Sequence, residues 1–167
     1  MSVGLIMSEI PNSERVKKAV VEWTKPRLLD KQNPLDVAWY DGQLSNTGIY
    51  YISRKFGANE TLLYIGQTSD SYFTRIQAHQ ENWLYQVRGR IFIRLGYIVK
   101  PSKKSDLEMK QIIKDIEGAL IFEMKPPYNV DGKNSYTPKH LYAITNDRYR
   151  GALPESFSMR SHILEKQ

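Results

Sequence analysis

The chain has 167 residues, with 24 Lys and Arg against 18 Asp and Glu, a formal net charge of +6, and no cysteine. This length favours one domain, and 41% hydrophobic with 25% charged residues is close to the globular average, which excludes wholesale disorder. The lack of cysteine excludes disulfides, a thiol nucleophile and a cysteine-based zinc site, and no apolar run is long enough to span a bilayer. We therefore expect a soluble, cytoplasmic, basic protein with no membrane partner.

The N-terminal part predicts a helix followed by an irregular connector. Ser13 is a suitable N-cap, and Pro26 would end a helix over residues 13–25. Apolar residues recur on one face of this helix, namely Val16, Ala19, Val20 and Trp23. That face would either cover the sheet or serve as the interface of a homodimer.

The middle of the chain predicts a β-hairpin, a helix, a strand and a second helix. The hairpin has strands over 48–52 and 62–65, joined by a polar loop over 54–61. A helix over about 71–87 and a buried strand over 91–99 follow. Ser105-Asp-Leu-Glu108 is a capping box that opens a helix to about Met124.

These elements, with a short strand over 140–145, predict an α/β fold of the layered α+β kind. We expect a small three-stranded central sheet, antiparallel or mixed, that contains the β-hairpin and is flanked by helices. The chain divides into an N-terminal helical extension (1–46), a core (47–129) and a C-terminal extension (130–167) that belongs to the same single domain.

Glu117 is an anomaly in the helix that begins at Ser105. The apolar stripe of this helix consists of Met109, Ile112, Ile113, Ile116 and Leu120, and Glu117 lies at its margin. An unpaired charge at such a position is costly, so the carboxylate needs a partner. The partner is either an ordinary basic side chain or a cation.

Two further pairs of side chains have spacings that suit a site. Arg75 and His79 are four residues apart and project from one face of the preceding helix, although surface residues often share this spacing. Tyr50 and Tyr64 lie on adjacent hairpin strands, where their phenols either meet or simply reach water.

Taken together in chain order, these residues resemble the GIY-YIG nuclease superfamily. Both name-giving tripeptides are present, as Gly48-Ile-Tyr50 and Tyr64-Ile-Gly66, on strands predicted to pair. Arg75 and His79 follow on the next helix, Glu117 lies on a later one, and Asn129 closes a Pro-Pro-Tyr-Asn segment. The resemblance covers about residues 47–129, and the short flanks are most similar to the superfamily's restriction endonucleases.

The resemblance implies a DNA endonuclease that depends on Mg²⁺ or Mn²⁺. Glu117 would bind the metal, and Arg75 would stabilise phosphate charge. Tyr50 would take the proton of the attacking water, with His79 accepting or stabilising the proton on Tyr50, and Tyr64 would bind the phosphate or a metal-bound water. Supporting roles fall to Gly48 and Gly66, where a Cβ would obstruct packing or the site, and to Asn129, which would anchor the segment after the helix.

A basic stretch predicts contacts with the backbone of double-stranded DNA. Between Glu81 and Asp106 the chain has no acidic residue. It contains six basic ones in this interval, which are Arg88, Arg90, Arg94, Lys100, Lys103 and Lys104. A solvated basic face with no partner explains the same pattern.

Three functions remain open at this point. The first is a type II restriction-like endonuclease, which usually acts as a homodimer or cuts twice. The second is a non-catalytic nucleic-acid-binding module, and the third is a structure-specific nuclease of DNA repair or recombination. The complete set of five side chains favours catalysis, because binding alone needs no carboxylate facing a phosphate.

Overall fold

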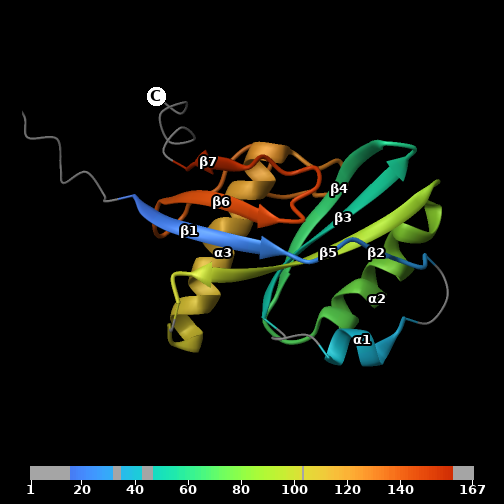
Figure 1. The fold of residues 1–167 in the computed structure, drawn as a ribbon, viewed down its shortest axis with the longest axis horizontal. Coiled ribbons are helices and arrows are strands. Elements are labelled where there is room, and N and C mark those ends of the chain that lie inside the picture. Colours follow the sequence, from blue (N-terminus) through green and yellow to red (C-terminus); the bar gives the residue numbers. More distant parts are fainter. Residues whose placement is uncertain (1–15, 32–34, 43–46, 103, 160–167) are drawn as a thin grey trace, which may run out of the picture.

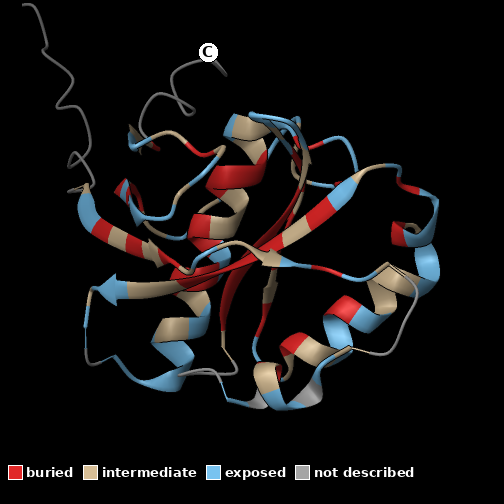
Figure 2. Ribbon diagram, turned by 45° about the vertical axis from the view of Figure 1, so that its right-hand side comes forward, coloured by how far each residue is buried: buried red, intermediate tan, exposed pale blue. Residues whose placement is uncertain are grey.

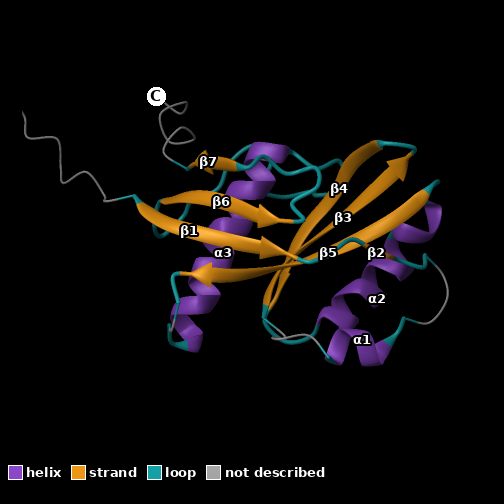
Figure 3. Ribbon diagram, in the orientation of Figure 1, coloured by secondary structure: helices purple, strands orange, loops and turns teal. Residues whose placement is uncertain are grey.

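The computed structural model describes residues 16–31, 35–42, 47–102 and 104–159. Its elements in these ranges follow one another as seven strands, three α-helices and one 3-10 turn (Figures 1 and 3). They are β1 (Lys17–Trp23), β2 (Arg27–Leu28), α1 (Val37–Asp41), β3 (Gly48–Phe56), β4 (Asn59–Thr68), α2 (Tyr72–Asn82), η1 (Leu84–Gln86), β5 (Arg90–Lys100), α3 (Asp106–Met124), β6 (Tyr142–Arg148) and β7 (Ser156–Ser158).

One seven-stranded mixed sheet organises the molecule. Its strand order is β4-β3-β5-β1-β6-β7, and β2 pairs with β5 beside this path. Only the pairing of β1 with β6 is parallel in the registers of the described strands. The predicted small three-stranded sheet flanked by helices is therefore wrong, because strands from both flanks extend the sheet, although the fold remains α+β.

The predicted N-terminal helix is also wrong where the structure describes it. Residues 17–23 form β1, between β5 and β6, while residues 13–15 lie outside the described ranges. Ala19, Val21 and Trp23 are buried at every second position, which is the period of a strand. Pairing with two distant strands outweighs local helix propensity. The apolar face is buried in the core, so it is not a dimer interface.

The central elements lie in the predicted order, but the strands extend through most of the predicted loop over 54–61, and α2 ends at Asn82, before the predicted end near residue 87. β3 and β4 form an antiparallel hairpin that turns at Gly57, whose φ of 58° suits a residue without a Cβ. In α3 the Ser105 side chain accepts from the Glu108 backbone and Glu108 reaches back to the Ser105 backbone. The predicted capping box is thus confirmed.

Helices cover both faces of the hairpin and β5. α3 packs against Ile49, Tyr51 and Ile65 on one face, within a core that also includes β1 and β6. α1 and α2 contribute to a second core on the other face, around Tyr50 and Ile52. Figure 1 shows α3 at the left and the α1–α2 pair at the right, and Figure 2 shows the buried residues along the crossing strands. The edge strand β4 therefore runs between α2 and α3.

The C-terminal extension is tied to α3 by a buried carboxylate. Asp115 accepts hydrogen bonds from the backbone N–H groups of Lys139 (3.0 Å) and His140 (3.1 Å), and from the Gln111 side chain (2.8 Å). The chain then enters β6, two residues later than the predicted strand. None of the helices in the described ranges has the length and apolar character needed to cross a membrane.

Candidate active site at the edge of β4

A chain of hydrogen-bonded rings lies on the α2 face of the hairpin. Tyr50 projects from β3, and its hydroxyl is 2.7 Å from Nε2 of His79 on α2. The indole Nε1 of Trp83, one turn further along, donates to Nδ1 of the same imidazole at 3.0 Å. Tyr64, from β4, packs edge-on to His79 with ring centroids 4.4 Å apart. The sequence therefore brings both predicted tyrosines to the predicted histidine.

Trp83 determines where His79 carries its proton. An indole N–H only donates, so Nδ1 of His79 must be the acceptor. Burial and the positive charge of Arg75 lower the pKa of His79 to about 4, so the imidazole is neutral at pH 7. Its single proton is therefore on Nε2 and is donated to the Tyr50 oxygen. His79 can stabilise negative charge on Tyr50, but Nε2 has no lone pair with which to accept a proton from it.

The two phenols differ in their access to solvent. Tyr50 is 0% exposed, and burial raises its pKa well above the usual value. Burial and then the negative charge of Glu117 raise the pKa of Tyr64, while a hydrogen bond with Tyr50 lowers it. Tyr64 is only partly buried and lines a surface hollow next to Glu117. Tyr64 is thus the phenol that faces the cleft, and Tyr50 lies behind it.

Glycine is required beside the ring of Tyr50 and beside the neighbouring ring of Tyr72. A Cβ at Gly66 would lie 2.5 Å from the Tyr50 hydroxyl oxygen. A Cβ at Gly48 would overlap the hydroxyl of Tyr72 and would lie 2.9 Å from the Gly96 carbonyl oxygen. Since neither distance is possible for a real side chain, both glycines allow the rings to pack against the strands.

Arg75 and Glu117 meet at Gln67, near the end of β4. Nε of Arg75 donates to the Gln67 carbonyl oxygen at 3.3 Å, and the side chain of Gln67 hydrogen-bonds Glu117 from the α3 side. Burial raises the pKa of the Glu117 carboxyl to about 7, against the hydrogen bond from Gln67 and the charges of Arg75 and Lys114. No lysine or arginine among the described residues forms an ion pair with Glu117.

Glu117 is the side chain of this site that could hold a divalent cation, because it is a partly buried carboxylate beside the hollow. Mg²⁺ is commonly held by one or two carboxylates, with water and phosphate oxygens completing its shell. Within the described ranges no group of three or more His, Asp or Glu side chains is placed to hold a metal without such additional ligands. Glu117 is compatible with a site that has a single protein carboxylate, because its oxygens are partly shielded from water and lie beside a surface hollow.

Asn129 closes the open edge of β4. Its side-chain amide donates to the Ile65 carbonyl at 2.8 Å and accepts from the Ile65 N–H at 3.0 Å. The backbone N–H of Tyr128 also donates to the Leu63 carbonyl at 3.0 Å. Since Ile65 lies between Tyr64 and Gly66, these bonds hold the site's strand where it would otherwise be an unpaired edge.

Four of the predicted DNA-contacting residues are exposed, and they lie towards the two ends of β5. Arg88 and Arg90 are exposed near the start of β5, whereas Lys100 and Lys104 are exposed near its far end. These ends are roughly 30 Å apart for an 11-residue strand. Lys103 lies outside the described residues.

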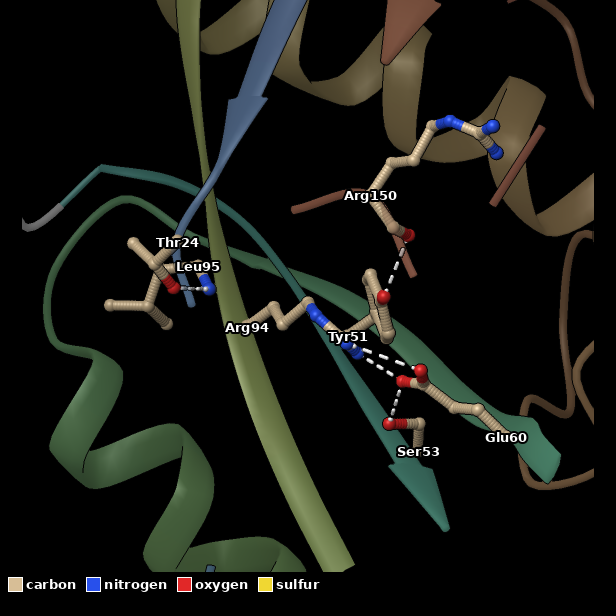
Figure 4. A network of polar contacts seen from close by, with 7 residues as sticks. All are labelled: Thr24, Tyr51, Ser53, Glu60, Arg94, Leu95 and Arg150. Carbon is tan, nitrogen blue, oxygen red and sulfur yellow. Dashed lines mark hydrogen bonds and ion pairs between the residues drawn. The ribbon is translucent and has the colours of Figure 1, made fainter. Parts of the chain in front are cut away.

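Arg94 does not face solvent, so its predicted contact with DNA is wrong. Arg94 is 4% exposed, and its guanidinium binds both carboxylate oxygens of Glu60, which also accepts from Ser53 at 2.7 Å (Figure 4). The Tyr51 ring lies 5.3 Å from the guanidinium carbon. The pairing with Glu60, on the neighbouring hairpin, could not be identified from the charge pattern of the sequence.

Two further residues of the site were not among the sequence candidates. Trp83 holds the tautomer of His79, and its position four residues after His79 was the available signal. Gln67 connects Arg75 to Glu117, but nothing in the sequence marks it beyond its place after Gly66.

Comparisons of the chain with protein-family models, curated proteins and solved structures gave no match.

Proposed function

We propose that the protein is a metal-dependent DNA endonuclease of the GIY-YIG superfamily that hydrolyses phosphodiester bonds, a type II restriction-like enzyme. The observation that carries this proposal is the convergence of five side chains that are scattered over 68 residues of sequence, from Tyr50 to Glu117. The remaining residues of the matching motif, Gly48, Gly66 and Asn129, support the strands that present them.

The charged residues have complementary tasks in this reaction. The Arg75 guanidinium would hold the oxygens of the scissile phosphate and stabilise the charge that develops on them. Glu117 and the phosphate would hold Mg²⁺ or Mn²⁺, which supplies Lewis-acid stabilisation when bound. The negative charge of Glu117 raises the pKa of both phenols, so neutralising that charge makes their deprotonation easier.

The roles that we propose for Tyr50 and Tyr64 differ from those implied by the sequence resemblance. Direct contact of Tyr50 with an attacking water is blocked by its burial, so we assign the cleft-facing position to Tyr64. In this scheme, the Tyr64 phenol first loses its proton to solvent in the cleft, and the resulting phenolate takes a proton from the attacking water while the Tyr50 hydroxyl donates a hydrogen bond to it. His79 acts as a positioning residue, because its Nε2–H donates to the Tyr50 oxygen and so directs the Tyr50 hydroxyl hydrogen to Tyr64.

The partner in this proposal is double-stranded DNA, and the cellular location is the cytoplasm. A restriction-like enzyme must cut two strands, either as a homodimer or in two successive events. A homodimer would use a surface other than β1, whose apolar face is internal.

The decisive experiment is digestion of supercoiled plasmid with Mg²⁺, with Mn²⁺ and with EDTA. We expect cleavage with either metal and none with EDTA. Glu117→Gln keeps the shape of the side chain and removes its charge, so cleavage should fall at least about a hundredfold while DNA binding in a gel shift persists. Glu123→Gln is the matched control, because Glu123 is an exposed carboxylate on the same helix.

Each outcome of this digestion identifies a different function. Discrete fragments indicate a restriction-like enzyme, and a smear indicates a nonspecific nuclease. Cleavage only of branched substrates indicates a repair or recombination nuclease. Retarded but uncut DNA indicates a binding module and contradicts the proposal, as does full activity of Glu117→Gln.

A further inference from the structure

A hollow of about 430 Å³ opens directly beside the catalytic residues. It lies between α3 and the segment over 128–138, and both Glu117 and Tyr64 line it. Any DNA strand whose phosphate contacts Arg75 and Glu117 would therefore place an adjacent nucleotide at this hollow. The hollow is the aromatic side of the cleft, while the side next to Arg75 is lined by short polar residues such as Thr68 and Ser71.

The ring of Tyr128 forms a fixed platform in this hollow. It stacks on Trp83 with ring centroids 4.4 Å apart and planes inclined by 21°. Tyr128 lines the hollow and is 40% exposed, whereas Trp83, which stacks on one face of the Tyr128 ring, does not line it. The bonds from Tyr128 and Asn129 to β4 hold the backbone beneath the ring. The platform is therefore preorganised.

The opposite wall is kept back by a glycine. At Gly118, on α3, a Cβ would lie 3.1 Å from Cδ2 of Tyr136, a close contact, so the glycine lets the Tyr136 ring pack against the helix. Polar groups border the aromatic walls, among them the side chains of Lys114, Asp131 and Thr137. An aromatic face with donors and acceptors at its border is the chemistry that recognises a nucleobase.

We infer that this hollow binds one unstacked nucleobase of the strand that is cut. A base inside a duplex has both faces covered by its neighbours, so only an unpaired or outward-turned base can stack on Tyr128. The volume of about 430 Å³ accommodates a single nucleoside. This inference rests on the proposed nuclease function and adds to it a site for the base beside the scissile phosphate.

Photo-cross-linking in EDTA tests the contact without cleavage. The probes are a 12-nucleotide single strand in which one 5-iododeoxyuridine is moved through successive positions, the same strand in a duplex, and free 5-iododeoxyuridine monophosphate. We expect cross-links at Tyr128 or Tyr136, mapped by peptide mass spectrometry, from the single strand and the free nucleotide, and several-fold fewer from a duplex. Tyr128→Leu should lose the Tyr128 cross-link and bind the single strand about tenfold more weakly by fluorescence anisotropy.

Two control variants separate stacking from general effects. Tyr128→Phe keeps the ring and should behave as the wild-type protein does. Tyr149→Leu removes a similarly exposed tyrosine outside the hollow and should leave cross-linking and affinity unchanged.

The possible failures point to different conclusions. If plasmid is cut but no probe reacts in the hollow, the nucleobase site is wrong and the nuclease proposal stands. If plasmid is not cut but the free nucleotide cross-links to Tyr128, the nucleobase site stands and the catalytic proposal is wrong. Binding unaffected by Tyr128→Leu, with cross-links elsewhere, also overturns the site.

Discussion

The imidazole of His79 has one defined proton position because the residue four places later can only donate. Trp83 occupies Nδ1, which leaves Nε2–H for the buried hydroxyl of Tyr50. A solvent-exposed histidine would exchange between tautomers and would present either a donor or an acceptor to Tyr50. The Trp83 indole thus fixes His79 as the donor in its hydrogen bond with Tyr50, without forming a hydrogen bond to Tyr50.

Replacing Trp83 by Phe should remove the hydrogen bond that fixes the His79 tautomer and should change the pKa of His79. In the wild-type protein His79 is protonated near pH 4, whereas in the unfolded chain it is protonated near pH 6.5. The unfolded state therefore binds more protons between these values, so stability falls as the pH drops from 6.5 to 4. In Trp83→Phe the hydrogen bond that favours the neutral ring is lost, while burial and Arg75 still lower the pKa of His79. That pKa should therefore rise only in part, which reduces the loss of stability at acid pH, and cleavage should slow about tenfold at pH 7.5.

NMR titration of the His79 ring measures its pKa, and the ¹⁵N shifts report its tautomer. Urea unfolding at pH 7.5 and pH 4.5 measures the loss of folding stability at acid pH. Trp39→Phe is the matched control, because the ring of Trp39 packs on Tyr40 and Arg27 instead. An unchanged tautomer and pKa in Trp83→Phe would contradict the assigned role.

At the level of elements, the site depends on an edge strand that is closed by a side chain. β4 pairs with β3 on one side only, and Asn129 bonds both backbone groups of Ile65 on the other. The segment after α3 is thereby placed beside the strand that presents Tyr64 and Gly66. This arrangement also positions Tyr128, so the candidate site residues and the proposed base platform share one support.

Asn129→Ala should loosen this edge. Two hydrogen bonds are lost and the Ile65 N–H and carbonyl lose their partner, so the free energy of unfolding should fall by about 2–3 kcal/mol. Urea unfolding measures this change, and hydrogen exchange of the Ile65 amide should accelerate. Asn134→Ala, an exposed position in the same part of the chain, should change little. An unchanged exchange rate at Ile65 would contradict the proposed closure.

At the level of the whole molecule, distant segments of the chain share one core. Residues of β1, β3, β4, β6 and α3 pack together, so the two flanks are built into the same body as the hairpin. Asp115 links the C-terminal segment to α3, because its two carboxylate oxygens accept hydrogen bonds from the backbone N–H groups of Lys139 and His140. A carboxylate suits this position because it only accepts hydrogen bonds.

Asp115→Asn should therefore destabilise the entire fold. One amide N–H would face a backbone N–H, and one buried donor would lose its acceptor, which costs about 2 kcal/mol. Thermal unfolding should remain a single transition at a lower temperature, because the flank and the hairpin share a core. Asp106→Asn, an exposed aspartate on the same helix, is the control. A separate early transition of the C-terminal part would contradict the single core.

The sequence alone determined the elements whose signals are local. The hairpin strands around Tyr50 and Tyr64, the helix carrying Arg75 and His79, and the capping box at Ser105 depend on neighbouring residues. Turn residues, caps and apolar periodicity act over a few positions, so they can be identified without knowing what lies opposite in space.

Only the tertiary structure decided which partner each element and each charge would take. Val21 and Trp23 belong to a strand because β5 and β6 pair with it, and Arg94 is internal because Glu60 meets it from the adjacent hairpin. The approach of Glu117 to Gln67 and Arg75 likewise depends on how α3 packs against β4. Long-range pairing and burial outweigh local propensity in these cases, because their free energies arise from contacts between segments that the order of residues does not place together.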